Sequence, residues 1–284
     1  MHHLKIFIDL TRLNKPIGFM LLFWPCSWGL AYAHFVNNNN NLFVYYLFLF
    51  FLGSVLMRSA GCIFNDIVDK DIDIKVERTK NRPIASGKIS VSLSLVYVLV
   101  LCIISLIILI QFNLKTIILG LGSMVLAFSY PFMKRLTYWP QLFLGLTFNW
   151  GMIMAYTAIL DQISIEIFVL YFSAIFWTLG YDTIYGVQDI TDDEIIGIKS
   201  TSIKFKKNLK LFVCTCYVIT CSLLIILFFD DLGINILTLF ATMFVISLVY
   251  QLKIFNKDEP SSCLKAFKFN NFSGILLFIT ILMQ

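Results

Sequence analysis

Apolar residues occur along the chain in long runs that are separated by short polar segments. A run of about twenty apolar residues is long enough to cross the ~30 Å hydrocarbon core of a bilayer as a helix. In lipid, a helix satisfies all the backbone hydrogen bonds of such a run internally. The pattern predicts nine transmembrane helices, at roughly 17–35, 43–64, 91–112, 115–133, 140–160, 164–185, 210–229, 232–251 and 267–283.

Composition supports the same conclusion. The chain is 59% hydrophobic and 14% charged, whereas soluble domains are about 45–50% apolar and about 25% charged. No polar segment is long enough to form a separate soluble domain. We therefore expect an all-α integral membrane protein with one polytopic domain over residues 1–284. The net charge of +5 is attributed to membrane anchoring, with no nucleic acid and no protein partner implied.

The distribution of Lys and Arg predicts the orientation of the chain. Nearly all 22 basic residues fall in alternate connections or at the helix ends beside them. These connections are 1–16, 65–90, 134–139, 186–209 and 252–266. Because basic residues concentrate on the cytoplasmic side, we expect the N-terminus inside, the C-terminus outside and the functional site on the inner face.

The first inner loop begins with an acidic cluster, NDIVDKDID, over residues 65–73. If the second helix continues through it, Asn65, Asp66, Asp69 and Asp73 share a sector of about 100°, and Asp71 points away. A calcium-binding EF-hand loop is excluded, because Ile74 and Lys80 stand where that loop needs Gly and Glu. A solvated acidic face remains the alternative for this cluster alone.

A second acidic cluster follows the sixth predicted helix. Asp182, Asp189 and Asp193 are spaced seven and four residues apart, so on a helix they would stack within ~40° of one another. The two acidic loops, at about 65–90 and 182–209, suggest a weak internal duplication. Carboxylates gathered at a membrane boundary need cations nearby. Their hard oxygen ligands favour Mg²⁺ bound to a polyphosphate over a softer metal.

Basic residues lie near the acidic clusters along the chain, as a diphosphate site requires. Arg58 is notable because it lies inside an apolar run, where a charge is costly and therefore indicates function. For most loop lysines, simple membrane anchoring is the alternative. The candidates for phosphate contact are Arg58, Arg78, Arg82, Lys134, Arg135 and Lys199.

These motifs together resemble the UbiA superfamily of intramembrane prenyltransferases. The resemblance rests on Asn65-Asp66-x-x-Asp69-x-x-x-Asp73, Arg78-Thr79-x-x-Arg82-Pro83, Tyr130-Pro131-Phe132-x-Lys134-Arg135, Asp189-x-x-x-Asp193 and Gly197-Ile198-Lys199-Ser200-Thr201. It spans nearly the whole chain. The segments RLNKPIG from Arg12 and MRSAGCIFND from Met57 are similar to members that act on 4-hydroxybenzoate.

The resemblance implies a fold and an activity. About nine helices would surround a central cavity capped by the two acidic loops, with a lateral opening for a long isoprenoid tail. The implied reaction transfers a polyprenyl chain from its diphosphate to the ring carbon of 4-hydroxybenzoate ortho to the hydroxyl, in ubiquinone biosynthesis. The implied cofactor is Mg²⁺. The implied location is a bacterial inner membrane, with the site on the cytoplasmic side.

The resemblance also assigns roles to individual residues. Metal and diphosphate binding falls to Asn65, Asp66, Asp69, Asp73, Asp189 and Asp193. Asp182 joins this catalytic set or removes a proton from the acceptor. Phosphate contacts are assigned to Arg58, Arg78, Arg82, Tyr130, Lys134 and Lys199. Arg135 is the candidate for the benzoate carboxylate, because a planar guanidinium can bind it bidentately.

Three alternatives remain in view at the level of the sequence, of which a purely structural membrane protein would leave the paired acidic clusters unexplained. Another acceptor, such as a naphthoate or haem, would keep every metal-binding residue and change only the cavity. A membrane transporter would also place charged residues within apolar helices. It predicts polar residues at mid-membrane, whereas here they gather at the inner ends of the helices.

Overall fold

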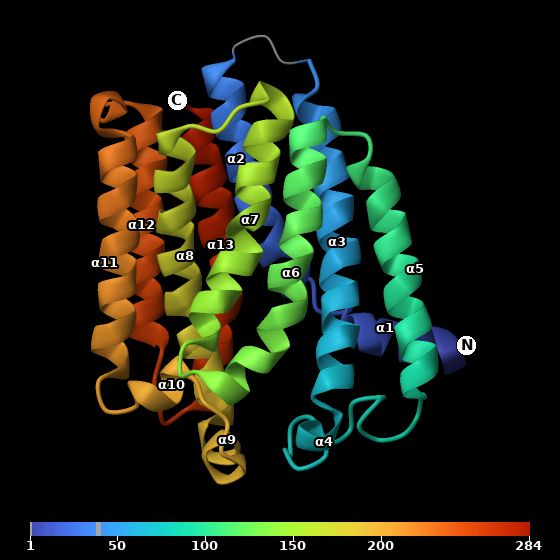
Figure 1. Cartoon of the computed structure of the whole chain (residues 1–284). Helices are drawn as coiled ribbons and strands as arrows, with labels where there is room; N and C mark the ends of the chain where they lie inside the picture. The colour runs from blue at the N-terminus through green and yellow to red at the C-terminus, as the bar shows by residue number, and fades with distance from the viewer. Residues whose placement is uncertain (1, 38–40) are drawn as a thin grey trace.

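Residues 2–37 and 41–284 are described by the computed structural model, and all their regular structure is helical. Long helices run roughly parallel through the molecule, and short ones gather at one end (Figure 1). The long helices are α2 (Ile17–Val36), α3 (Phe43–Val68), α5 (Val91–Leu109), α6 (Leu114–Leu136), α7 (Pro140–Leu160), α8 (Ile165–Tyr185), α11 (Leu209–Leu227), α12 (Ile236–Ile254) and α13 (Pro260–Leu282). The all-α prediction is confirmed.

Eight helices in the described part of the chain are long and apolar enough to cross a membrane, with α8 counted together with its extension to Ile196. Together with the composition, they make this an integral membrane protein. The ninth long helix, α13, begins at Pro260, seven residues before the predicted apolar run, and its first half carries Lys265 and Lys268. The count of nine spans and the direction of the termini stay predictions.

Polar residues at the helix starts explain where several of these helices begin. Ser90 accepts a hydrogen bond from the Leu93 amide at the start of α5, and Asn113 does the same for Thr116 in α6. Asn235 caps α12 through the Thr238 amide. Each cap satisfies an amide that has no partner within its own helix. Such caps fix the first residue of helices whose apolar sequences do not otherwise show where the helix begins.

The core lies where α2 packs against α7, α8 and α13. Trp28 of α2 and Trp177 of α8 are fully buried, with ring centroids 5.0 Å apart. The Trp28 indole N–H donates to the Gly274 carbonyl of α13 at 3.0 Å. Gly29 is the point of closest approach to α7, because a Cβ there would overlap the Met152 carbonyl. α2 is therefore the central helix of the bundle.

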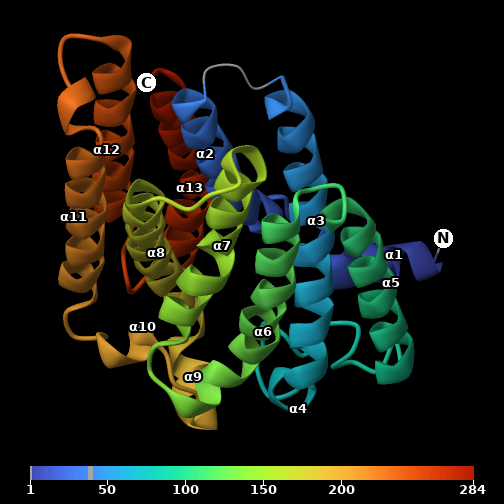
Figure 2. The ribbon, with the colours of Figure 1, turned by 45° about the horizontal axis from the view of Figure 1, so that its top comes forward.

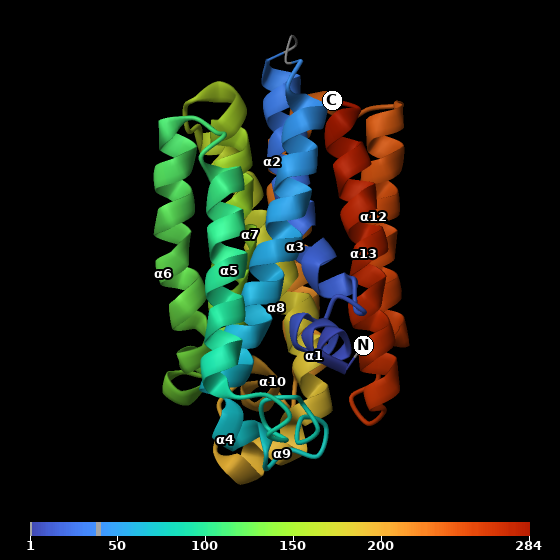
Figure 3. The ribbon, with the colours of Figure 1, turned by 90° about the vertical axis from the view of Figure 1, so that its right-hand side faces the viewer.

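Shorter helices lie at the end of the bundle opposite the C-terminus (Figures 1 and 2). They are α4 (Lys70–Asp73), η1 (Gly186–Asp189), α9 (Ile190–Ile196) and α10 (Thr201–Lys204); a further turn, η2 (Phe229–Asp231), lies elsewhere, between α11 and α12. An N-terminal helix, α1 (His2–Thr11), lies across the bundle beside α3 (Figure 3). The sequence did not predict α1, because its apolar residues are too few to form a membrane span.

We predict that Gly29→Ala destabilises the folded protein by about 1–3 kcal/mol, because the added methyl group forces α2 away from α7. The unfolding midpoint of the purified protein in detergent would measure this. Gly122→Ala in α6 is the matched control, since a Cβ at that position meets none of the described atoms within 4 Å. Alanine also favours helix over glycine there. Equal loss of stability in both variants would contradict the packing role of Gly29.

Candidate active site

The first acidic cluster lies at the inner end of α3 and in the loop that follows. α3 ends at Val68 and the short helix α4 begins at Lys70, so the predicted continuation of one helix through residue 73 is wrong. The break lies at Asp69, whose φ of −94° and ψ of 5° leave the helical region. Asp66, Asp69 and Asp73 are nevertheless all buried and line one cavity, whereas Asp71 is exposed.

The second cluster lies at the inner end of α8. The helix tightens into the 3₁₀ turn η1 over Gly186–Asp189 before α9, and Asp182, Asp189 and Asp193 line the same cavity as the first cluster. Gly197, with a φ of 80°, ends α9 in the left-handed conformation that glycine adopts without strain. The chain then returns to α6, where the Lys199 amide donates to the Lys134 carbonyl at 2.9 Å.

Arg78 joins the two acidic loops. Its guanidinium donates to both carboxylate oxygens of Asp189, at 2.7 and 2.6 Å, and to the Tyr185 hydroxyl at 3.3 Å. It also lies over the Tyr185 ring, 5.8 Å from the centroid. Bidentate pairing of this kind fixes orientation as well as distance. Arg78 thus holds together two segments that are 111 residues apart in sequence.

The remaining buried carboxylates are each paired with basic side chains. Asp66 accepts from Arg12 at 2.6 Å and from Arg82 at 3.1 Å, and Arg82 also bonds Asp73 at 2.8 Å. Asp69 pairs with Lys134 and accepts from the Asn65 amide at 2.9 Å. A buried carboxylate without such a partner would be strongly destabilising. Acidic and basic groups therefore alternate through the site.

The environment of Asp73 and Arg12 shifts the pKa of each group. Burial raises the pKa of the Asp73 carboxyl above its ordinary value; Arg82 lowers it, while nearby Asp66 and Asp69 raise it further. Burial alone would lower the pKa of Arg12, but Cys62 and then Asp66 raise it overall. Because burial is the largest cause of the raised pKa of Asp73, the ion pair with Arg82 offsets only part of the cost of burying this carboxylate.

The donor atoms of the site fit a divalent metal. Among the described residues, no three His, Cys, Asp or Glu side chains are already grouped as metal ligands. Arg and Lys side chains instead pair with four of the carboxylates, those of Asp66, Asp69, Asp73 and Asp189. They and the Asn65 amide nevertheless line one cavity, and they offer only hard oxygen atoms. The candidate ligands are Asn65, Asp66, Asp69, Asp73, Asp189 and Asp193.

One large cavity of about 1460 Å³ contains this site. The two acidic clusters lie at its inner end, and its apolar walls extend outward between α3, α5, α6 and α7. All but one of the predicted site residues line it, Tyr130, Lys134 and Lys199 included. The predicted juxtaposition of the two motifs is therefore present in the structure, while the role assigned to each residue stays a prediction.

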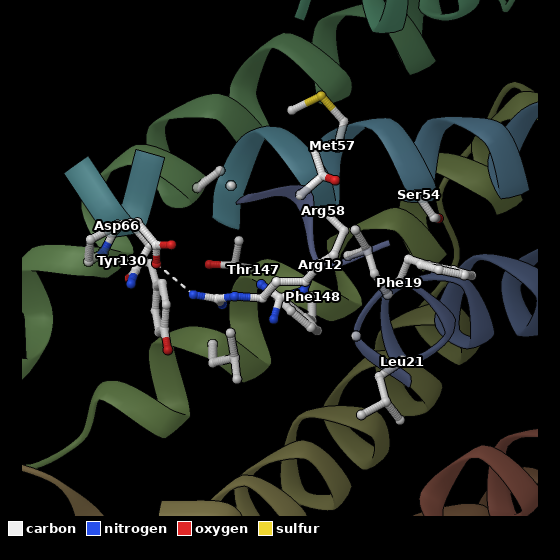
Figure 4. Close-up of a pocket in the computed structure, with 18 of the residues that line it drawn as sticks. Arg12, Phe19, Leu21, Ser54, Met57, Arg58, Asp66, Tyr130, Thr147 and Phe148 are labelled. Carbon is white, nitrogen blue, oxygen red and sulfur yellow. Dashed lines mark hydrogen bonds and ion pairs between the residues drawn. The ribbon is translucent and has the colours of Figure 1, made fainter. Parts of the chain in front are cut away.

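Arg58 lies deeper in the cavity than the carboxylate cluster. Its guanidinium points inward beside Phe148, with the Arg58 Cζ atom 5.3 Å from the ring centroid (Figure 4). Its Nε atom is buried without a hydrogen-bond partner among the described residues. Asp182 is close enough to interact with it electrostatically. Arg58 is thus a cation within the cavity, and its Nε–H group has no hydrogen-bond acceptor among the described residues.

Arg135 is the predicted residue that the cavity lining does not include, within the part of the chain described. Its guanidinium donates to the Val68 carbonyl at 2.7 Å, at the end of α3, and approaches Asp69 at 3.5 Å. It also lies over the Phe132 ring of its own helix. This geometry supports a role in holding the end of α3 and does not support the predicted contact with a benzoate carboxylate.

Arg12 is a site residue that sequence reasoning did not assign. It lies between α1 and α2 with a φ of 56°, an unusual backbone conformation for a residue other than glycine. From there its side chain reaches Asp66, and Figure 4 shows it extended through the pocket. The feature of the sequence that could have identified Arg12 is its place in the motif RLNKPIG, directly before the first predicted transmembrane helix.

Residues 22–274 match the UbiA prenyltransferase family, and the chain therefore belongs to that family. Among curated relatives, the mitochondrial 4-hydroxybenzoate polyprenyltransferase of Drosophila melanogaster is 40% identical over 98% of this chain and 71% of its own length. The 4-hydroxybenzoate octaprenyltransferase of Aliivibrio fischeri is 40% identical over 98% of this chain and 95% of its own.

Solved structures show the same fold. A UbiA homologue from Aeropyrum pernix K1 matches 92% of this chain and 96% of its own with a TM-score of 0.77 at 22% identity. A second UbiA homologue, from Archaeoglobus fulgidus and bound to GPP and Mg²⁺, matches 98% of this chain and 99% of its own with a TM-score of 0.71 at 17% identity. The resemblance stated from the motifs is confirmed at the level of the family, and it favours an enzyme over the transporter alternative.

Proposed function

We propose that this protein is a Mg²⁺-dependent prenyltransferase. It transfers a polyprenyl chain from polyprenyl diphosphate to the ring carbon of 4-hydroxybenzoate ortho to the hydroxyl, in ubiquinone biosynthesis. The observation that carries the proposal is the meeting of two carboxylate clusters at the inner end of a long cavity, where basic side chains pair with the buried Asp66, Asp69 and Asp73 and with Asp189. The 40% identity to enzymes named for this acceptor supports the choice of substrate.

The inner end of the cavity is assigned to the diphosphate. Bound Mg²⁺ would neutralise the charge of the diphosphate group as it leaves. Arg78, Arg82, Lys134, Lys199 and the Tyr130 hydroxyl line the cavity and would contact phosphate oxygens. The carboxylates already hold Arg82 and Lys134 in place. Preorganised charges of this kind favour the transition state, in which negative charge grows on the leaving group.

The acceptor is assigned to the region around Arg58. Its guanidinium has unused donors inside the cavity, and the Phe148 ring beside it offers an aromatic surface. A charge-assisted bond to the benzoate carboxylate would satisfy those donors and orient the ring. Arg58 is therefore a better candidate for this contact than Arg135, which is occupied by the Val68 carbonyl.

The chemistry follows from this placement. The bond between the prenyl C1 and the diphosphate oxygen breaks, which leaves an allylic cation, and the ortho ring carbon forms a bond to C1. The aromatic side chains Tyr130 and Phe148 line the cavity and would stabilise the cation. The ring then loses its ortho proton. Asp182 lines the cavity beside Arg58 and is the candidate acceptor of that proton.

We infer that the protein lies in a bacterial inner membrane and that its active site is on the cytoplasmic side. The Lys and Arg residues concentrate in the connections at the end where the acidic loops lie. Lys115, the exception, lies at the other end of α6 and pairs with Asp161. An interfacial site suits a donor with a charged head and an apolar tail, because each part remains in its own solvent.

The proposal is tested with purified protein, 4-hydroxybenzoate and prenyl diphosphates of graded length. We expect a carbon-prenylated product with Mg²⁺, no product in EDTA, and recovery when Mg²⁺ is added back. Full turnover in EDTA would contradict metal dependence. A parallel panel with a naphthoate or haem acceptor tests the acceptor: product from one of these alone would overturn the assignment to 4-hydroxybenzoate while leaving the donor chemistry intact.

Asp69→Ala and Asp189→Ala should each abolish turnover, because each removes an oxygen donor and the anchor of a basic side chain. Both variants should remain folded and inserted in the membrane, as size-exclusion chromatography would show. Asp71→Asn is the control, since Asp71 is exposed and lies outside the cavity lining; its turnover should stay near that of the wild type. Near-normal turnover in either alanine variant would contradict the assignment of that aspartate to metal and diphosphate binding.

Arg58→Gln should raise KM for 4-hydroxybenzoate far more than KM for the prenyl diphosphate. Loss of one charge-assisted contact costs on the order of 2–3 kcal/mol, or roughly 30- to 150-fold in kcat/KM. Arg135→Gln is the matched comparison and should affect the two substrates equally, because its guanidinium holds the end of α3. Steady-state kinetics with each substrate varied in turn decides the matter. The opposite pattern would restore Arg135 as the carboxylate ligand.

A further inference from the structure

A buried glutamine near the start of α7 joins this helix to the second acidic loop. The Gln141 Oε1 atom accepts a hydrogen bond from the Thr201 amide at 3.0 Å, across 60 residues of sequence. Because a backbone N–H group can only donate, the side-chain atom that faces it must be the carbonyl oxygen of Gln141. The contact therefore fixes which way the Gln141 amide is turned, and its Nε2 group must face the other way.

The segment that carries Thr201 is itself attached to α8. The Thr201 and Thr183 hydroxyl oxygens lie 2.7 Å apart, and the Ser202 hydroxyl donates to the Thr183 carbonyl at 2.7 Å. All three residues are fully buried, so water does not compete for these hydrogen bonds. They tie α10 to the end of α8, and the Gln141 side chain is bonded to that fixed segment.

The Nε2 group of Gln141 is left without a protein acceptor at the wall of the cavity. Gln141 is 6% exposed and lines the cavity, and among the described residues its only hydrogen-bonded side-chain atom is Oε1. Gly186 leaves space beside the amide, because a Cβ there would lie 3.3 Å from Nε2 and 2.5 Å from the Ser202 Oγ atom. A donor of fixed orientation in a cavity wall is the kind of group that orients a bound ligand.

Gln141 and Phe148 lie on one face of α7. They are seven residues apart, which is two helical turns and about 10 Å along the axis, and both line the cavity. Phe148 is the ring beside the Arg58 guanidinium (Figure 4). Leu144 lies between them and also lines the cavity. This wall of the cavity therefore runs from a cation, past an apolar side chain, to an amide donor.

The order of these groups matches the acceptor from end to end. 4-Hydroxybenzoate carries a carboxylate at one end of an apolar ring and a hydroxyl at the other. Its outermost oxygen atoms are about 6 to 7 Å apart, so with a hydrogen bond at each end it bridges groups up to roughly 12 Å apart. With the carboxylate on Arg58, the hydroxyl points toward Gln141. The ortho carbon beside the hydroxyl then lies toward the end of the cavity assigned to the diphosphate.

We propose that Gln141 recognises the hydroxyl group of the acceptor, with its Nε2–H group donating to the hydroxyl oxygen. This inference rests on the proposed function for the identity of the acceptor. It deepens that function by naming the contact that distinguishes 4-hydroxybenzoate from an aromatic acid without a para hydroxyl. Arg58 selects for a carboxylate, and Gln141 selects for an oxygen atom at the opposite end of the ring. Together they fix which end of the ring faces the donor.

The test compares the binding of 4-hydroxybenzoate and benzoate by isothermal titration calorimetry, with Mg²⁺ and inorganic diphosphate present and no prenyl donor. The wild-type protein should bind 4-hydroxybenzoate more tightly than benzoate. Gln141→Met keeps the length of the side chain and removes the N–H donor. It should weaken the binding of 4-hydroxybenzoate by about three- to tenfold and leave the binding of benzoate unchanged.

Gln188→Met is the matched control. Gln188 also lines the cavity, but its Nε2 atom already donates to the Tyr185 carbonyl at 3.0 Å. This variant should leave the preference for 4-hydroxybenzoate over benzoate unchanged. In Gln141→Met, an equal loss for both acids would overturn the proposal, because Gln141 would then act only by anchoring Thr201. An undiminished preference for 4-hydroxybenzoate would overturn it as well.

The wild-type protein alone tests the proposal if Gln141→Met does not fold. Equal affinity for benzoate and 4-hydroxybenzoate, or tighter binding of 3-hydroxybenzoate, would show that no residue recognises a para hydroxyl. Failure of the proposed function gives a different result. In that case the wild type binds none of these acids, although polyprenyl diphosphate with Mg²⁺ still raises its thermal unfolding midpoint. The acceptor assignment is then wrong, and the role of Gln141 falls with it.

Discussion

The structure depends on the neutralisation of buried carboxylates at the edge of a membrane. Asp66, Asp69 and Asp73 are almost fully buried, and each would be prohibitively costly there without a cation. Arg12, Arg82 and Lys134 supply that charge from three different parts of the chain. The need to bring these cations together decides where the inner loops lie. The same balance leaves a site whose charges can be redistributed when an anionic ligand and a metal enter.

The apolar part of the molecule serves a different requirement. Trp28 and Gly29 bring α2 into close contact with α13 and α7, and other residues of α2 and α7 line one side of the cavity. Residues of α3, α5 and α6 line the opposite side of the cavity, where α5 packs on α3 and α6 packs on α7. The cavity thus lies between the buried core around Trp28 and helices whose outer faces carry many exposed apolar side chains.

The spacing of polar residues was enough to predict which carboxylates and basic side chains line one end of the cavity, and apolar run length was enough to predict the long helices. Asp69 and Asp189 were found because regular intervals place carboxylates on one helical face. The break at Asp69 was not predictable, since it depends on how the loop folds back to bring Arg82 onto Asp73. The contacts of Arg12 and Arg135 were not predicted for a related reason: their partners lie 54 and 67 residues away, and sequence does not show which way a long side chain turns.

The link between Arg12 and Asp66 has a practical consequence for protein engineering. The N-terminal helix α1 and the residue that follows it form part of the wall of the site, although α1 lies outside the bundle of long helices. An affinity tag, a fluorescent fusion or a truncation at that end would disturb the position of Arg12, whose side chain neutralises the buried Asp66. The C-terminus lies at the opposite end of the molecule from the acidic loops (Figure 1), so Gln284 is the better point of attachment for a purification handle or reporter.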